Sequence, residues 1–505
     1  MSNEDRDSLA NSGQTLGHAK WAAARLIAAL LWCIVAMDEG KTIAQGAMSP
    51  RPTTQETAKP DNRQTPTDGQ QGAQVHTGVT SGMDTEARLQ NLLVDHQFLR
   101  IEAQLDQMPA DEAQFYRGIL ANRKNDLKAS VALLEPLAEQ IAAAGVPGQE
   151  KLLRRALAED YLRLGQWAKA ANAYSTLEQR VGTQLTADEQ DELELPVKLL
   201  PLAAKNDPMT VDPYDAFGLP VSRNLLGLLD IPVFVDARPH SWMLEPTAPF
   251  NLIARSLARE AGVTVSDAAV TVHTITGRPM QVHMTVIPRF TIGGAITFHN
   301  MTAFVFEDSD YAFRQTHYQV QGVLGYAAVA ALGSLTITDN AMIEVRPPAT
   351  GSKSEANYHS DPGAPIFFDG DQMVVAMKNA GPAGAAATKP GDERMFVLDA
   401  SGQQTYLTSR YYEEHARDFM GQKMDMFTLL ASPNTAAQPA YSAETVNLAF
   451  GPTVVAVHYI PVLTLPVGDA ALDDVYGVLG LDALDQLAAY TFDFKAMTLS
   501  VRNRE

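Results

Sequence analysis

The sequence predicts a multidomain α + β protein in which an N-terminal helical-repeat region precedes two mainly-β lobes of one design. From about residue 85 to 205 the apolar residues recur at helical spacing. Beyond residue 230 short strand-like runs replace them, and distinctive segments recur about 154 residues apart. With 505 residues, of which 46% are hydrophobic, the chain is long enough for about three domains with cores of their own.

Two markers in one register indicate that the β part is duplicated. An apolar run leads into Glu245, and a similar run leads into Asp399, 154 residues later. A second segment, Gly322-Val323-Leu324-Gly325, recurs as Gly477-Val478-Leu479-Gly480, 155 residues later. In the same alignment Asn251 matches Thr405 and Ile253 matches Leu407. Because both markers keep their spacing, a tandem duplication is the simplest interpretation.

These segments resemble the retropepsin-like aspartic proteases of the pepsin and retropepsin clan. In that family an apolar run leads into Asp-Thr-Gly-Ala, which is followed by a Thr and a Leu. A Gly-Ile-Leu-Gly run comes some eighty residues later, and a helix and a last strand follow it. The resemblance implies acid-protease lobes over residues 230–346 and 363–505, joined by a linker at 347–362. It is supported by a predicted helix at 253–263 and by a predicted hairpin over 269–287, which in the family forms the flap over the cleft.

The resemblance also implies a site. Paired carboxylates share one proton, so one activates a water and the other protonates the scissile carbonyl. Carried onto this sequence, Asp399 and Glu245 are the catalytic pair. The substrate-binding positions implied are Ser401, Thr405, Thr247 and Gly277.

Both acidic triplets depart from the family pattern. Glu245-Pro246-Thr247 has a longer acid, no hydroxyl beside it and a proline without a backbone donor. Asp399-Ala400-Ser401 lacks the hydroxyl and carries a side chain where glycine would permit close approach. Three functions therefore stay open: an aspartic endopeptidase, an inactive pseudoprotease that binds extended peptide or a protein partner, and a scaffold with structural lobes.

Composition and the histidines restrict the partners. A formal net charge of −20 disfavours nucleic acid and is compatible with a peptide or protein substrate. His273, His283, His299 and His317 fall on separate strand-like segments without metal-ligand spacing. No metal, and no cofactor of any kind, is predicted.

The N-terminal part of the chain, positions 1–84, is predicted to target and tether the protein. Lys20 and Arg25 precede twelve apolar residues, and small residues follow at 44–46, so residues 1–47 are predicted to be an export signal, with a retained membrane anchor as the alternative. The expected location is periplasmic or extracellular. Residues 48–84, rich in Pro, Thr, Gln and Gly, are predicted to be a disordered linker. The single cysteine, Cys33, allows no intramolecular disulfide.

The helical region, residues 85–205, resembles tetratricopeptide repeats. Residues 157–174 have the small and large apolar spacing of such a helix pair, and residues 125–134 echo it in an alignment that matches Asn125 with Gln166. This predicts either a groove for a peptide or protein partner or a helical cap on the β lobes. Residues 206–230 are predicted to be a connector, and residues 381–391 a long loop before the Asp399 strand.

Overall fold

The computed structural model describes residues 80–504 apart from 226, 274–278, 314–317, 349–362, 380–392, 401, 403, 429–436 and 468–469. The predicted export signal, residues 48–79 of the predicted linker, and the expected site residues Gly277 and Ser401 lie outside the described residues. Residues 80–84, predicted to belong to the linker, instead begin the first described helix. No helix in the described part of the chain is long and apolar enough to cross a membrane.

The helical region is built from helix–turn–helix units with one type of turn. Its helices are α4 (Thr80–Val94), α5 (Phe98–Leu105), α6 (Ala110–Arg123), α7 (Leu127–Leu134), α8 (Ala138–Ala144), α9 (Pro147–Arg163), α10 (Trp167–Val181) and α11 (Ala187–Ala203). His96, Asn125 and Gly165 each adopt a left-handed conformation at a turn, with φ of 52°, 60° and 67°. Asn125 is thus equivalent to Gly165, and the alignment predicted from the sequence, which matched Asn125 with Gln166, is wrong by one position.

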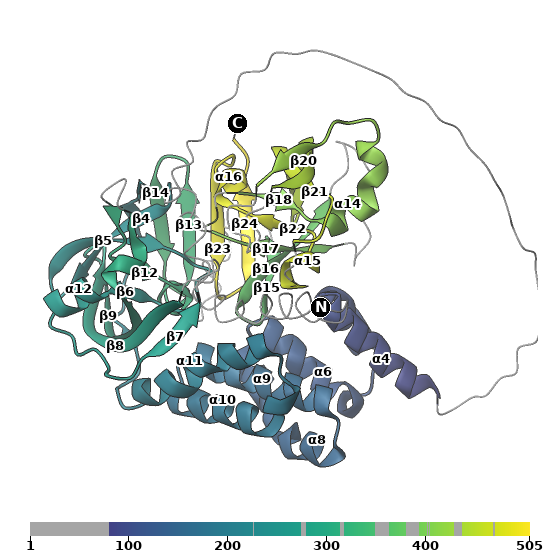
Figure 1. The fold of residues 1–505 in the computed structure, drawn as a ribbon, viewed down its shortest axis with the longest axis horizontal. Helices are drawn as coiled ribbons and strands as arrows, with labels where there is room; N and C mark the ends of the chain where they lie inside the picture. The colour runs from purple at the N-terminus through teal and green to yellow at the C-terminus, as the bar shows by residue number, and fades with distance from the viewer. Residues whose placement is uncertain are drawn as a thin grey trace, which may run out of the picture.

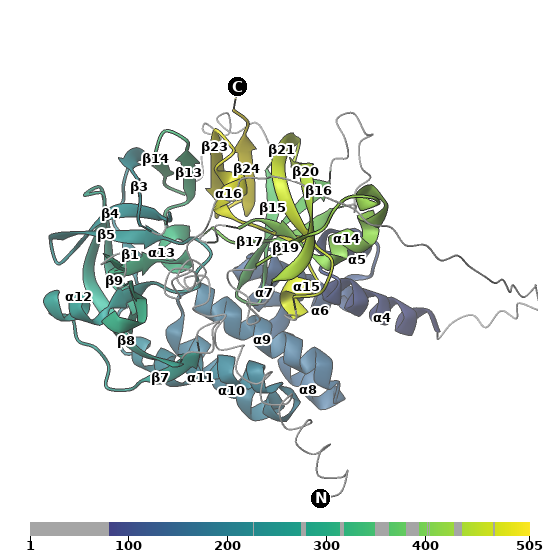
Figure 2. The same cartoon turned by 45° about the horizontal axis from the view of Figure 1, so that its top comes forward.

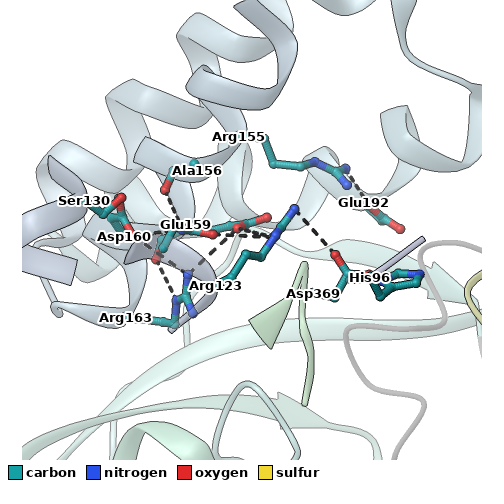
Figure 3. A network of polar contacts seen from close by, with 11 residues as sticks. His96, Arg123, Ser130, Arg155, Ala156, Glu159, Asp160, Arg163, Glu192 and Asp369 are labelled. Atoms are coloured by element: carbon teal, nitrogen blue, oxygen red, sulfur yellow. Dashed lines mark hydrogen bonds and ion pairs between the residues drawn. The ribbon is translucent and has the colours of Figure 1, made fainter. Parts of the chain in front are cut away.

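A buried carboxylate joins three of these helices. Asp160 on α9 is fully buried. It accepts hydrogen bonds from Asn122 Nδ2 at 2.9 Å and from Ser130 Oγ at 2.6 Å, and Figure 3 shows Asp160 beside Ser130 and Arg163. Burial raises the pKa of Asp160 to about 6, against the opposing effects of the Ser130 hydrogen bond and the Arg163 charge.

We expect Asp160→Asn to flatten the pH dependence of stability between pH 4 and 6. In that range the folded chain keeps the Asp160 proton while the unfolded chain has lost it, so raising the pH costs up to about 3 kcal/mol of unfolding free energy. Asparagine does not titrate, and the variant should not lose this stability. Urea unfolding at pH 4, 5, 6 and 7 measures the difference, with the exposed Asp106→Asn as control. Equal slopes for Asp160→Asn and wild type would contradict the assignment.

The first β half comprises residues 210–346. Its elements are β1 (Thr210–Val211), β2 (Phe217–Pro220), β3 (Ser222–Arg223), β4 (Leu229–Val235), β5 (Arg238–Leu244), β6 (Leu252–Ala254), α12 (Arg255–Glu260), β7 (Val270–His273), β8 (Pro279–Ile292), β9 (Ile296–Phe306), β10 (Ala312–Phe313), β11 (Tyr318–Gln319), β12 (Gly322–Leu324), α13 (Tyr326–Ala330), β13 (Ser334–Thr338) and β14 (Met342–Arg346). The predicted hairpin is present as the antiparallel pair β7–β8.

Two expectations for the first half need correction. The predicted connector is partly strand, because β1, β2 and β3 pair with β9, β14 and β4. Apolar residues such as the buried Leu219 make this segment an edge of the sheets although Asp-Pro pairs indicated turns. The helix predicted at 253–263 is limited to α12, since Leu252 and Ile253 are buried and pair with β9 and β12.

The second β half comprises residues 363–504. Its elements are β15 (Ala364–Asp369), β16 (Gln372–Asn379), β17 (Arg394–Leu398), β18 (Tyr406–Leu407), α14 (Ser409–His415), β19 (Asp425–Phe427), β20 (Gln438–Phe450), β21 (Thr453–Leu463), α15 (Ala470–Asp473), β22 (Gly477–Leu479), α16 (Leu481–Leu484), β23 (Ala489–Asp493) and β24 (Thr498–Arg502).

The two halves share one pattern of strand pairing. β12 runs parallel to β5 and antiparallel to β6, and β22 runs parallel to β17 and antiparallel to β18. The register is also equivalent, because Val323 lies opposite Met243 as Val478 lies opposite Val397. In each half the short strand after the acid then runs parallel to a long strand, β6 to β9 and β18 to β21.

The halves meet along β13 and β23, two strands at equivalent positions in their own halves. These strands pair antiparallel with Thr336 opposite Thr491, 155 residues later, and the two hydroxyls are 2.8 Å apart. Within the described chain they lie at the centre of the strand order β2-β14-β13-β23-β24-β15, which is part of a 13-stranded sheet. The pairing thus relates the halves by a local twofold arrangement.

The helical region packs along one side of both β halves, as Figures 1 and 2 show. Leu195 and Leu199 of α11 share an apolar core with Val270 of β7 in the first half. Phe98 contacts Phe367 of the second half, with 5.0 Å between ring centroids. The helices therefore cover the β halves, which is one of the two arrangements that the sequence predicted for them.

Polar contacts also tie the helical turns to the turn between β15 and β16. His96 Nδ1 lies 2.9 Å from Asp369 Oδ2, and Arg123 Nη2 lies 3.5 Å from Asp369 Oδ1 (Figure 3). Burial opposes ionisation of Asp369, but the Arg123 charge and the contact with His96 hold the pKa of this carboxyl well below its usual range. Asp369 is therefore charged at neutral pH and anchors the helical region to the second half.

Candidate functional site

The two acids occupy equivalent positions at the ends of parallel strands. Glu245 follows β5, and its N–H donates to Leu324 O of β12 at 3.0 Å. Asp399 follows β17, and its N–H donates to Leu479 O of β22, also at 3.0 Å. Glu245 is fully buried and Asp399 is 7% exposed. Each acid thus follows a strand whose last three residues are buried, and its backbone is fixed by the neighbouring strand.

A glycine after β12, and another after β22, lets the backbone close on each acidic loop. Tyr326 N–H donates to Ala248 O, and Leu481 N–H donates to Gly402 O, both at 2.7 Å. A Cβ on Gly325 would lie 2.2 Å from Phe250 O, and a Cβ on Gly480 would lie 2.8 Å from Gly402 O. Both contacts are too short for any side chain, so this approach explains the last glycine of each Gly-Val-Leu-Gly run.

The side chains of Asn251 and Thr405 hold the same loops from within. Gly325 N–H donates to Asn251 Oδ1 at 3.0 Å, and Gly480 N–H donates to Thr405 Oγ1 at 2.9 Å. The Thr405 hydroxyl also donates to Asp482, which accepts the Thr405 backbone N–H at 2.8 Å. Thr405, a predicted substrate-binding position, is buried, and its hydroxyl makes hydrogen bonds within the second half.

Each carboxylate is oriented by its own loop. Thr247 donates to Glu245 Oε1 with its backbone N–H at 3.1 Å and also with its hydroxyl. The Gly402 N–H donates to Asp399 Oδ1 at 2.6 Å. Thr247, another predicted substrate-binding position, is buried and directed at Glu245. The longer Glu side chain is thus folded back onto the residue two positions after it.

Gly402 is a site residue that the sequence comparison missed. A Cβ at this position would lie 2.4 Å from Asp399 Oδ2, so the side chain of any other residue would displace the carboxylate. The close approach expected at position 401 therefore occurs one residue later. Gly402 is the only glycine between residues 396 and 407, and that signal was available in the sequence.

Glu245 also lies near the strand that joins the two halves. Burial raises the pKa of Tyr490 on β23, and the negative charges of Asp485 and Glu245 add to the effect. Tyr490 belongs to the second half, so the charge of the first acid contributes to the environment of a residue in the other half.

Two cavities are formed by described residues that include neither acid. A cavity of about 690 Å³ lies between the helical region and both β halves, and one of about 280 Å³ lies beside β3 and α16. Neither Glu245 nor Asp399 lines either of them. The larger cavity is nevertheless lined by Phe250, which lies in the loop that follows Glu245. It is also lined by Tyr326, whose N–H donates to Ala248 O of the same loop.

Of the four histidines considered in the sequence, the two whose side chains the structure describes each have a polar partner. His283 Nδ1 lies 2.8 Å from Ser266 O, and His299 Nε2 lies 3.1 Å from Asp212 Oδ1. Within the described ranges no three His, Cys, Asp or Glu side chains are grouped to hold a metal ion. The side chains of His273 and His317 lie outside the described residues.

Comparison with known proteins gives one family and several distant structures. A family model for aspartyl proteases matches residues 231–328. Similar solved structures include conglutin gamma, a basic 7S globulin from lupine seeds, at 11% identity with a TM-score of 0.37, covering 58% of this chain and 96% of that chain. Basic 7S globulin from soybean gives 12% identity and a TM-score of 0.37, with 58% and 97% covered. A retropepsin-like aspartic protease from Rickettsia conorii gives 17% identity and a TM-score of 0.21, with 26% and 99% covered.

No curated protein matches the chain. The aspartyl protease match begins in β4 and ends in α13, so it contains Glu245, Asn251 and Gly325. The chain is therefore similar to the aspartyl protease family over the part of the first half that surrounds the first acid.

Proposed function

We propose that the chain is an aspartic-type peptidase in which the two β halves pair as retropepsin-like lobes and present Glu245 and Asp399 as one unequal dyad. The observation that carries this proposal is the equivalent placement of the two acids. Each follows a strand that runs parallel to a Gly-Val-Leu strand, and each is held by a hydrogen bond to the carbonyl of the corresponding leucine.

The pairing between halves supports a shared site. Thr336 and Thr491 occupy equivalent positions, and they face each other at the centre of the β13–β23 pair. A twofold rotation that superimposes β13 on β23 would also superimpose the loop of Glu245 on the loop of Asp399. A substrate between the halves would meet one acid from each side, as hydrolysis by paired carboxylates requires.

The chemistry proposed needs only the two carboxylates and a water. One carboxylate removes a proton from the water as it attacks the peptide carbonyl, and the other, protonated, gives its proton to the carbonyl oxygen. Thr247 and Gly402 keep the two carboxylates in place through the hydrogen bonds described above. Export, and recruitment of a partner by tetratricopeptide-like helices, are further parts of this proposal.

A second candidate, peptide binding without hydrolysis, is favoured by two observations. Glu245 is fully buried, and Thr247 donates two hydrogen bonds to one of its oxygens. With Pro246 and Ala400, neither acid is followed by the hydroxylated residue of the family pattern. In this case an extended peptide would bind between the halves by adding a strand to an exposed sheet edge.

A digest of a denatured mixed-peptide library over a range of pH separates the two functions. A peptidase should release new termini, with an acidic optimum, and the Asp399→Asn variant should not. A binding protein should release none but should retain peptides on the immobilised chain. As a complementary test, Pro246-Thr247 and Ala400-Ser401 are both changed to Thr-Gly, which should create activity if only the triplets block it. Cleavage that persists in Asp399→Asn would exclude the proposed mechanism.

A further inference from the structure

The strand β19 is an edge strand of the second half, at one end of the 13-stranded sheet. Among the residues that the structure describes, it pairs with β20 and with no strand on its other side. The equivalent strand of the first half, β7, begins 155 residues earlier and is covered by α11, whose Leu195 and Leu199 share a core with Val270. An open edge presents backbone donors and acceptors to other chains, so proteins usually cover or blunt it.

The segment around this edge carries exposed apolar side chains. Met420 is 77% exposed, Met424 is 48% exposed and Met426 is 65% exposed. By contrast, Met373 and Met377 of β16 in the same half are buried. Flexible methionine side chains are common at protein-binding surfaces, and exposed apolar groups beside an open strand edge indicate such a surface.

The backbone of Met426 faces the open edge. Pro439 of β20 lies opposite Met426, and its carbonyl oxygen accepts the N–H of Thr464 at 3.3 Å, on the other side of β20. In an antiparallel sheet the two backbone groups of one residue point to the same side, so Pro439 does not hydrogen-bond to Met426. The N–H and C=O of Met426 therefore point away from β20, and the alternation along a strand gives Met424 the same direction.

Oppositely charged side chains flank Met424. The Lys423 side chain is 89% exposed and that of Asp425 is 79% exposed, with Nζ and Oδ1 3.6 Å apart. If a second copy pairs antiparallel with Met424 opposite Met424, Lys423 of each copy lies opposite Asp425 of the other. In this register Met424 forms the hydrogen-bonded pair, and the two Lys–Asp pairs are non-hydrogen-bonded pairs, in which opposed side chains are closest.

We propose that two copies of this chain associate by antiparallel pairing of their β19 edges about a twofold axis at Met424. The pairing extends β19 to Lys423 and continues the sheet from one copy into the other. The charges favour a second copy over an unrelated peptide, because one sequence supplies both members of each Lys423–Asp425 pair. The interface is isologous, so it closes as a dimer, and because it is short the association is weak.

Sedimentation velocity of the full chain, from micromolar to near-millimolar concentration, should show a monomer–dimer equilibrium. Asp425→Lys places lysine opposite lysine in both pairs and should raise the dimer dissociation constant at least about tenfold, as should Lys423→Asp with its opposed aspartates. An equimolar mixture of the two variants restores both opposite-charge pairs and should dimerise as wild type does. The matched control is Asp267→Lys, which makes the same charge change at an exposed residue of the first half and should not weaken the dimer.

Cysteine cross-linking tests the register. In a Cys33→Ser background, Met424→Cys should form a disulfide between copies under mild oxidation, because the two copies of residue 424 face each other. Met426→Cys should not, since it would lie opposite Gln422, four residues along the strand from its counterpart and beyond the reach of a disulfide. The proposal is overturned if the chain sediments as a monomer throughout, if Asp425→Lys dimerises as wild type does, if the mixture of variants stays monomeric, or if both cysteines cross-link equally.

Discussion

Asp399→Asn is expected to lower kcat/KM for peptide hydrolysis by about 10³-fold, within the range that general acid–base catalysis contributes. Asparagine has nearly the shape of aspartate, and its Oδ1 can still accept the hydrogen bond from Gly402 N–H. It cannot take or give the proton on which the dyad depends. Steady-state kinetics at several pH values, with the melting temperature as a check of folding, measure the effect.

Glu245→Gln should cost about as much, and the double variant little more, because the two carboxylates of the proposed dyad would act as one unit. The control is Glu344→Gln on β14, an exposed carboxylate in the strand next to β13, which should leave kcat/KM unchanged. A Glu245→Gln variant as active as wild type would show that Asp399 works without a partner in the first half.

The sequence predicted local features of the site better than its surroundings. Val323 lies opposite Met243, and Val478 lies opposite the equivalent residue Val397. This match follows from the sequence, because the number of residues between the acid and the Gly-Val-Leu-Gly run is nearly the same in both halves. Strand register depends on such local patterns and turn lengths, so it can be inferred from one chain. The position of Gly402 was missed because the family triplet was applied residue by residue, whereas here the glycine that closely approaches the carboxylate is residue 402.

Contacts between distant parts of the chain could not be predicted, because they leave no pattern in the sequence. His96, Arg123 and Asp369 meet only because the helical turns dock on the β15–β16 turn, and nothing near each residue in the sequence indicates its partner. The same holds for the packing of α11 on the β7–β8 hairpin and for the cavity between the helical region and both β halves. Such features depend on how domains pack, which composition and periodicity do not specify.

Gly325→Ala is expected to lower the free energy of unfolding by about 3 kcal/mol, the upper end of what overpacking usually costs. The new Cβ would lie 2.2 Å from Phe250 O and 2.8 Å from Ala248 O. Both oxygens are backbone atoms of the loop that follows Glu245, so no side-chain rotation can relieve the contact. Denaturant unfolding monitored by tryptophan fluorescence measures the loss, since Trp242 on β5 is fully buried beside this loop.

The size of the effect should follow the distance of the contact. Gly480→Ala, whose Cβ would meet Gly402 O at 2.8 Å, should cost about 1–2 kcal/mol, less than Gly325→Ala. Gly148→Ala on α9 meets no atom within 4 Å, and it should instead stabilise the helix by up to about 1 kcal/mol. If the three substitutions had the same effect, the glycines would not be needed for close approach. Because the displaced atoms belong to the loops that follow Glu245 and Asp399, the first two substitutions should also reduce the proposed peptide hydrolysis under conditions where the protein remains folded, and Gly148→Ala should not.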